Sequence, residues 1–269
     1  MFLRSLVFAV LLCFCLAPRA EANVYVFALS EDYPPMHMTG TDGEMTGFNI
    51  ELFAAICKAA GITPAFVHTQ WNTIFDELAE GKFSAVVSAA TITDARRQKV
   101  DFTDPYFEAM QTVVVLSGAE ISRDKDLKDK KIGAWGATTS FEECRRIARF
   151  SGASQVVPFP DVESSMFALA QGQLDAVFTD SPTAASYVFE DERFAGKLAV
   201  GFTIPSKIPD NFGFPVNKNE QELLGKLNAG LKAVKASGEY DRIYEKWFST
   251  MAQKSRDSKW NIFNFKFPW

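Results

Sequence analysis

The sequence predicts an α/β protein made of two similar lobes, and three observations support this expectation. Strand-like and helix-like segments alternate along the chain, which is typical of a largely parallel sheet covered by helices. Residues 78–87 resemble residues 169–178, which start 91 positions later. The chain has 269 residues, about twice the length of a usual single domain. Two consecutive units of one architecture would account for all three observations.

The elements of the first lobe follow from apolar spacing and from two glycines that can end a helix. Residues 48–60 repeat apolar side chains at helical intervals, and Gly61 suits the left-handed position that ends this helix. Gly81 suits the same position after the helix expected at 71–80. A third, strongly apolar segment predicts a strand buried on both faces. In chain order the expected elements are a strand at 24–29, a helix at 48–60, a strand at 62–68, a helix at 71–80 and a strand at 83–90.

The second half repeats this pattern and lacks a Pro/Gly/Ser-rich linker. A strand and helix at 131–148 precede the second copy of the repeat, and helices are expected at 219–236 and 240–248. Two further strands, at 113–118 and 212–218, would run out of the first lobe and back into it. The expected divisions are residues 23–115 with 210–250 in lobe 1, residues 116–209 in lobe 2, and an aromatic tail at 251–269 in which Phe263, Phe265, Phe267 and Trp269 alternate with other residues.

The N-terminal residues read as a secretory signal peptide. Arg4 precedes an apolar run at 6–17, and the small-x-small tripeptide Ala20–Glu21–Ala22 suits a cleavage site. The apolar run is too short to span a bilayer. We therefore expect an exported, soluble chain cleaved near Ala22.

Composition and motifs argue against several classes of function. The formal net charge of −5 gives no basic face for nucleic acid. Motif searches find no nucleophile elbow, zinc-protease motif, Cys-x-x-Cys pair or phosphate-binding loop. The two histidines, His37 and His68, have no partner motif and are expected at the surface. No catalytic residue, metal or cofactor is expected.

Polar residues instead gather where strands end, which is where ligands bind in open α/β sheets. Arg96 follows the repeat strand, and its planar cation could grip a carboxylate. Each such residue has a structural alternative: Arg96 and Arg97 could be solvated, Thr138 and Asp180 could cap helices, and the aromatic residues could be core. The residues collected at strand ends, with two nearby aromatics, are Ser30, Tyr33, Trp71, Ala89, Thr91, Arg96, Thr138, Thr139 and Asp180.

Five stretches that span nearly all of residues 24–248 resemble the polar amino-acid-binding proteins of bacterial ABC importers, which are type 3 extracellular solute-binding proteins. The most specific stretch is TITDARRQKVDFTDPY, inside residues 83–107. The others are 47–61, 131–140, 172–184 and 217–248.

This resemblance implies a periplasmic-binding-protein-like fold, two α/β lobes joined by a two-strand hinge with the ligand cleft between them. It implies a periplasmic protein that captures a free amino acid by lobe closure and delivers it to a membrane-embedded ABC permease, acting as a monomer and not as an enzyme. Cys57 and Cys144 would then lie in different lobes, where a disulfide would obstruct opening, so free thiols are expected.

The resemblance also implies a role for each candidate residue. Arg96 and Thr91 would hold the ligand carboxylate from the first lobe, and Thr138 and Thr139 from the second. Asp180 would pair with the ammonium group, assisted by the backbone around Ala89, and Tyr33 and Trp71 would flank the side chain. Ala89 replaces a serine or glycine common in relatives. Ser30 replaces an aspartate common in those that select cationic amino acids, although Glu31 and Asp32 could supply acidity instead.

Two alternatives remain open at this point. Cyclohexadienyl dehydratases share the fold and act on prephenate or arogenate, and Glu142 or Glu143 would be the acids to suspect. A sensor input module would need a signalling part attached to the membrane, which this sequence does not show.

Overall fold

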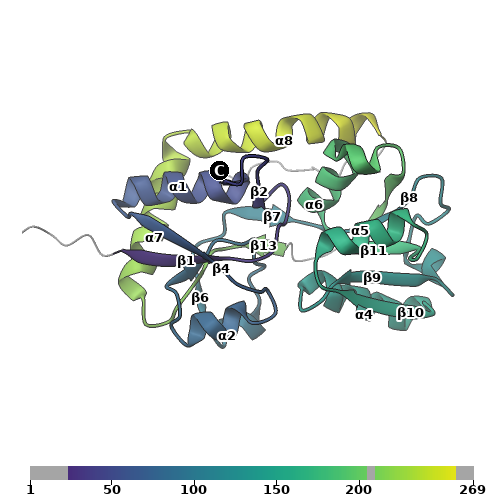
Figure 1. Cartoon of the computed structure of the whole chain (residues 1–269), viewed down its shortest axis with the longest axis horizontal. Coiled ribbons are helices and arrows are strands. Elements are labelled where there is room, and N and C mark those ends of the chain that lie inside the picture. Colours follow the sequence, from purple (N-terminus) through teal and green to yellow (C-terminus); the bar gives the residue numbers. More distant parts are fainter. Residues whose placement is uncertain (1–23, 205–209, 259–269) are drawn as a thin grey trace, which may run out of the picture.

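Two five-stranded sheets organise the protein, one in each lobe (Figure 1). The computed structural model describes residues 24–204 and 210–258. The predicted signal peptide and the aromatic residues of the tail, Phe263 to Trp269, lie outside the described residues. The α/β class and the two-lobed architecture are confirmed.

The lobe 1 sheet is mixed. Its first three strands are parallel, as expected for βαβ units. The fourth strand runs antiparallel to both neighbours, because it enters from the second lobe. The sheet order is β4 (Pro64–His68), β1 (Tyr25–Leu29), β5 (Ala85–Val86), β14 (Pro215–Val216) and β6 (Asp101–Phe102), and a separate short hairpin pairs β2 (Met38–Thr39) with β3 (Met45–Thr46).

Helices cover the lobe 1 sheet, with α1 (Phe48–Ala60) and α2 (Ile74–Ala79) on opposite sides of the strands in Figure 1. Gly61 has the predicted left-handed conformation, φ 67°, and ends α1 there. Phe48 anchors the contact of α1 with α8 (Glu239–Asp257), because its ring centroid lies 5.0 Å from that of Phe248. The remaining helices of this lobe are α3 (Asp94–Arg97) and α7 (Gln221–Ala236).

Two glycines of α7 differ in their surroundings and provide a matched test of this packing. A Cβ atom at Gly230 would lie 2.6 Å from the carbonyl oxygen of Ile56 in α1, whereas nothing lies within 4 Å of a Cβ atom at Gly225. Gly230→Ala should therefore lower the free energy of unfolding by about 1–3 kcal/mol. Gly225→Ala should raise it by up to about 1 kcal/mol, through helix propensity alone. Urea unfolding of both variants measures this, and a stabilising Gly230→Ala would contradict the close α1–α7 contact.

The lobe 2 sheet repeats the topology of the first. Three parallel strands are again followed by an antiparallel strand. Gly81 and Gly172, equivalent in the sequence repeat, both have positive φ, 79° and 72°, and strands begin four residues after each. The order is β10 (Gln155–Phe159), β9 (Lys131–Trp135), β11 (Ala176–Asp180), β8 (Gln111–Leu116) and β12 (Leu198–Thr203), and the helices are α4 (Thr139–Ser151), α5 (Val162–Ala170), α6 (Ser181–Ala185), η1 (Asp124–Leu127), η2 (Ser186–Glu190) and η3 (Glu192–Phe194).

A two-stranded antiparallel ribbon crosses between the lobes. It pairs β7 (Phe107–Ala109) with β13 (Asp210–Phe212). The expected strand at 113–118 corresponds to β8, which pairs with β11 and β12, so residues 111–115 belong to the lobe 2 sheet and the expected boundary at 115 is wrong. The expected strand at 212–218 divides into β13 and β14. We propose that lobe 1 holds residues 24–109 with 210–250, and lobe 2 residues 110–204.

Helix α8 is longer than expected and reaches both lobes along the upper edge of Figure 1. Its C-terminal half contacts η2 in lobe 2, where Lys254 donates a hydrogen bond to the carbonyl oxygen of Phe189 (2.8 Å) and pairs with Glu190 (2.9 Å). Residues 251–257 are therefore helical, which corrects the expected start of the tail at 251.

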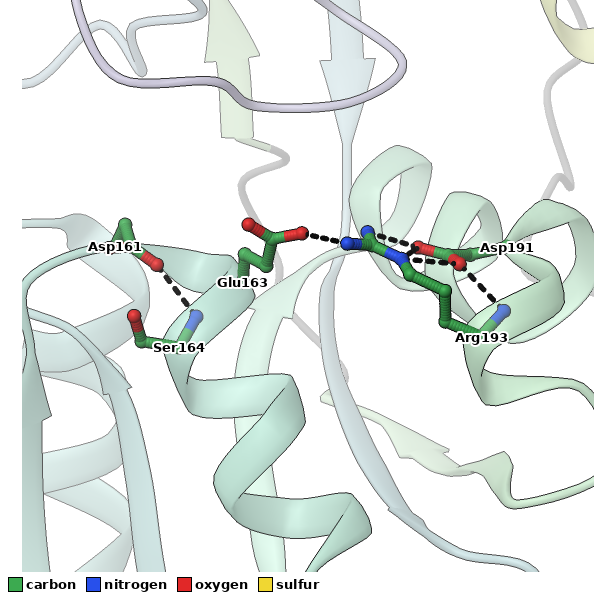
Figure 2. A network of polar contacts seen from close by, with 5 residues as sticks. All are labelled: Asp161, Glu163, Ser164, Asp191 and Arg193. Carbon is green, nitrogen blue, oxygen red and sulfur yellow. Dashed lines mark hydrogen bonds and ion pairs between the residues drawn. The ribbon is translucent and has the colours of Figure 1, made fainter.

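A polar network ties the start of α5 to η3 on the outside of lobe 2 (Figure 2). Asp161 caps α5 by accepting a hydrogen bond from the Ser164 amide (2.6 Å). Arg193 pairs with Asp191 (2.6 Å) and also reaches Glu163 at the first turn of α5. These contacts join the first turn of α5 to η3.

Cys57 and Cys144 are buried, one in each lobe, and form no disulfide, as expected. Burial raises the pKa of both thiols to about 12. Within the part of the chain that the structure describes, no helix is long and apolar enough to cross a membrane.

Candidate ligand-binding site

Arg96 provides a half-buried positive charge at the cleft between the lobes. Thr93 caps the N-terminus of α3, because its side chain accepts a hydrogen bond from the Arg96 amide (3.2 Å). One guanidinium nitrogen of Arg96 donates to the Thr91 carbonyl (2.8 Å). The guanidinium carbon lies 5.1 Å from the Trp71 ring centroid and 4.6 Å from that of Phe75. Burial lowers the pKa of Arg96 to about 10, so the group stays charged at neutral pH. No described carboxylate lies within 4.0 Å of it.

Three threonines line the same cavity as Arg96, and their hydroxyls are not equally free to bind a ligand. The hydroxyls of Thr91 and Thr139 lie 3.2 Å apart across the cleft. The Thr138 hydroxyl is occupied, because it caps α4 by accepting from the Phe141 amide (3.1 Å) and donates to the Trp135 carbonyl (2.5 Å). The Thr138 side chain is therefore a helix cap, as the structural alternative predicted. Its backbone amide could still donate to a ligand.

Asp180 ends β11 and faces lobe 1 across the cleft. One of its oxygens accepts a hydrogen bond from the Tyr33 hydroxyl (2.6 Å), and the other, Oδ1, is buried and has no partner among the described residues. Asp180 occupies the N-cap position of α6, but its side chain makes no capping hydrogen bond. Burial raises the pKa of Asp180 to about 7. The hydrogen bond from Tyr33 and the nearby amide and hydroxyl of Thr183 oppose this rise in pKa, and the charge of Asp210 adds to it.

This raised pKa predicts how Asp180→Asn changes stability with pH. The folded protein holds the Asp180 proton more tightly than the unfolded chain, so the contribution of Asp180 to the free energy of unfolding is full below about pH 4 and is lost as the pH rises through about 7. Relative to wild type, Asp180→Asn should gain stability over that interval, by about 1.4 kcal/mol per pH unit at the steepest.

Urea unfolding of both proteins between about pH 4 and about pH 7 measures this difference. The lowered pKa of His37 affects both proteins alike and cancels in the comparison. A difference that does not change with pH would show that Asp180 is ionised throughout.

All nine residues expected from the sequence line one small cavity between the lobes. The free space inside it is about 20 Å³, roughly enough for one water molecule. Hydrogen bonds cross the cleft around it, including one from the Trp71 indole nitrogen to the Ala137 carbonyl (3.0 Å). The lining residues are Ser30, Tyr33, His37, Trp71, Ala89, Thr91 and Arg96 from lobe 1, and Trp135, Thr138, Thr139, Ser140 and Asp180 from lobe 2.

Two lining residues, His37 and Trp135, were not expected from the sequence, and a third, Ser140, belongs to the strand-end residues 137–140 but was not among the nine candidates. His37 was assigned to the surface, but it is 1% exposed, whereas His68 is exposed as predicted. Trp135 ends β9, and its ring centroid lies 5.6 Å from that of Trp71 and 5.5 Å from that of Tyr33. Ser140 follows the cap of α4. The position of Trp135 at a strand end was the available signal for it, because that is where the other candidates were found.

The carboxylates suggested for catalysis lie outside this cavity. Glu142 pairs with Arg145 (3.4 Å) and Glu143 with Arg146 (2.5 Å), both on α4. Within residues 24–204 and 210–258, no group of three or more His, Cys, Asp or Glu side chains is placed to hold a metal ion.

Comparison with known proteins gives consistent matches. The family model of bacterial extracellular solute-binding proteins, family 3, matches residues 25–250. A probable histidine-binding protein from Neisseria gonorrhoeae is 33% identical over 236 residues, which cover 87% of this chain and 86% of that protein.

Two solved structures are similar over most of their length. An ancestral arginine-binding protein bound to arginine has a TM-score of 0.76 and 34% identity, covering 84% of this chain and 98% of that one. An ancestral amino acid-binding protein described as a precursor of cyclohexadienyl dehydratase has a TM-score of 0.74 and 34% identity, covering 84% of this chain and 95% of that one.

Proposed function

Because this chain belongs to family 3 of the bacterial extracellular solute-binding proteins, we propose that it captures a free amino acid between its lobes and delivers it to a membrane-embedded ABC permease. It acts in the periplasm as a monomer, after removal of the signal peptide near Ala22. The three similar proteins named above are all described as binding proteins, including the ancestral precursor of a dehydratase. Their descriptions support a binding role over catalysis.

One observation carries the proposal most strongly: the cleft holds a half-buried cation that has no described carboxylate within 4.0 Å, although Asp210 acts on it from further away. A charge that is partly withdrawn from water is costly unless it is paired, so Arg96 is suited to the carboxylate of an incoming ligand. Asp180 supplies the opposite charge from the other lobe, with an unpartnered oxygen available to an ammonium group. A cation and an anion fixed at one cavity match the two charges of an amino acid.

The other lining residues would complete the contacts to this zwitterion. The hydroxyls of Thr91 and Thr139 would donate hydrogen bonds to its carboxylate. The backbone amide of Thr138, at the N-terminus of α4, would donate to the same carboxylate. The backbone at Ala89 would take the ammonium group, while Tyr33, Trp71 and Ser30 would surround the side chain.

Capture requires the lobes to separate and close again, because the cavity is too small for an amino acid. The β7–β13 ribbon is the covalent crossing about which they would move. A ligand that contacts both lobes favours the closed arrangement by replacing the hydrogen bonds that now cross the cleft, such as those from Tyr33 and Trp71.

A thermal-shift screen of the common amino acids against the mature protein tests the proposal. For at least one of them we expect a dissociation constant of about 1 μM or lower, which corresponds to a binding free energy of roughly −8 kcal/mol or below. At a hundredfold excess over the dissociation constant, the ligand would stabilise the folded protein by about 2.7 kcal/mol. If no amino acid raised the melting temperature, the proposal would fail.

The dehydratase alternative is worth a direct assay, because one similar structure is described as a precursor of that enzyme. Arg96 would bind a substrate carboxylate in either case. Incubation with prephenate and arogenate should give no aromatic product, since Glu142 and Glu143 are engaged outside the cavity. Formation of such a product would make the protein an enzyme.

A further inference from the structure

Five residues of the cavity lining are uncharged and are not needed to match the two charges of the ligand. Under the proposed function, Arg96 and the threonines bind the ligand carboxylate, and Asp180, which also accepts a hydrogen bond from Tyr33 (2.6 Å), binds the ammonium group. The lining residues left for the ligand side chain are Ser30, Tyr33, His37, Trp71 and Trp135. The donors and acceptors that these residues leave free determine which ligand side chains can bind beside them.

His37 is one of these lining residues, and one of its ring nitrogens is a hydrogen-bond acceptor. Its Nε2 atom lies 3.0 Å from the Glu31 carbonyl oxygen, which can only accept, so Nε2 carries the proton. Nδ1 is then an unprotonated acceptor, and it is buried without a partner among the described residues. Burial also lowers the pKa of His37 to about 4, so the ring is neutral at physiological pH.

Ser30 and Ser88 extend this neutral surface. The two hydroxyls lie 3.0 Å apart, the Ser88 hydroxyl accepts from the Ser30 amide (2.8 Å), and Ser30 also contacts His37 Nε2 (3.3 Å). Both serines are buried. No member of this network carries a charge.

The carboxylates of Glu31 and Asp32, which follow Ser30 in the chain, are engaged elsewhere. Glu31 accepts a hydrogen bond from the Trp71 amide (3.0 Å), and Asp32 accepts from the Thr39 amide (3.1 Å) at an exposed position. Neither residue lines the cavity. The suggestion that they supply acidity to the ligand site is therefore not supported by their positions.

We infer that this protein selects an amino acid whose side chain is uncharged and donates a hydrogen bond, namely an amide or a neutral imidazole, over one with an ammonium or guanidinium group. The inference rests on the proposed function. A cationic side chain would lose its hydration and would find no carboxylate in the lining except Asp180, which the ligand ammonium group would occupy. Aromatic faces attract cations, but Arg96 already lies over the Trp71 ring and would repel a second one. A neutral donor would satisfy His37 Nδ1 and pack its plane against the aromatic rings.

Calorimetric titration at about pH 8, where free histidine is neutral, separates the possibilities. We expect glutamine, asparagine or histidine to bind at least about tenfold more tightly than arginine, lysine or phenylalanine. Arginine or lysine binding as tightly would overturn the exclusion of cations. Phenylalanine binding as tightly would overturn the need for a donor. If none of the six bound, the proposed function would be in doubt together with this inference.

A pair of variants of nearly equal size tests the charge argument directly. Ser30→Asp adds a carboxylate beside His37, and Ser30→Asn adds an amide in the same space. We expect Ser30→Asp, but not Ser30→Asn, to raise the affinity for arginine relative to glutamine by about tenfold or more. An unchanged ratio in a folded Ser30→Asp protein would overturn the inference. If Ser30→Asp failed to fold, the wild-type titrations would still decide.

Discussion

Arg96→Ala is expected to weaken amino-acid binding by about 2–5 kcal/mol, which is roughly 30-fold to 5,000-fold in the dissociation constant. The reason is that the half-buried guanidinium has no described carboxylate within 4.0 Å and would be the fixed cation for the ligand carboxylate. Calorimetry with the amino acid identified by the thermal screen measures the effect.

Arg97→Ala is the matched control for this experiment. Arg97 follows Arg96 in α3, but it is exposed and its guanidinium carbon lies 5.7 Å from the Phe102 ring centroid, away from the cavity lining. The Arg97→Ala protein should bind as wild type does. An Arg96→Ala protein that is folded and binds with unchanged affinity would remove Arg96 from the site.

Asp180→Asn is expected to cause a loss of similar size, about 2–5 kcal/mol, because the asparagine keeps the shape but not the charge that would face the ligand ammonium group. Tyr33→Phe is the comparison: it removes the hydroxyl that donates to Asp180 but leaves the carboxylate, so a smaller loss of about tenfold or less is expected.

A ligand analogue without the amino group makes the test specific. Such a carboxylic acid lacks the partner of Asp180, so Asp180→Asn should leave its affinity unchanged or improve it. An equal loss for the amino acid and its deaminated analogue would mean that Asp180 acts through the fold and not through the ammonium group.

Local signals in the sequence were sufficient for the elements that they define. The bounds of α1 were predicted because apolar spacing and Gly61 both lie within a few residues of the helix. The internal repeat was informative for the same reason, since Gly81 and Gly172 each impose a left-handed turn before a strand. These features depend on neighbours in the chain, which the sequence displays directly.

Features that depend on pairing between distant segments could not be predicted. The strand expected at 83–90 is regular only at Ala85–Val86, because residues 90–92 bond to the chain at 211–213 instead of continuing in the sheet. Residues 111–115 joined lobe 2 because β8 pairs with β11, which lies far along the sequence.

The candidate site shows the same division. The nine expected residues all line the cavity, because strand-end positions and the family resemblance locate them without knowledge of packing. His37 was misplaced because its burial depends on Ser30 and Glu31 folding over it. The use of the Thr138 hydroxyl as a cap likewise depends on backbone geometry that the sequence does not display.

Lobe closure around an amino acid is the central claim, and the distance between the lobes measures it most directly. Cysteines introduced as Asn72→Cys in lobe 1 and Arg149→Cys in lobe 2 would carry spin labels, since both positions are exposed. The native Cys57 and Cys144 thiols are buried, with pKa values raised to about 12, and should not react. Pulsed electron paramagnetic resonance then reports the distance distribution between the lobes.

We expect the amino acid that stabilises the protein to shift this distribution to shorter distances, and Arg96→Ala to abolish the shift at the same ligand concentration. A distribution that does not change while calorimetry shows the amino acid to be bound would contradict capture by lobe closure.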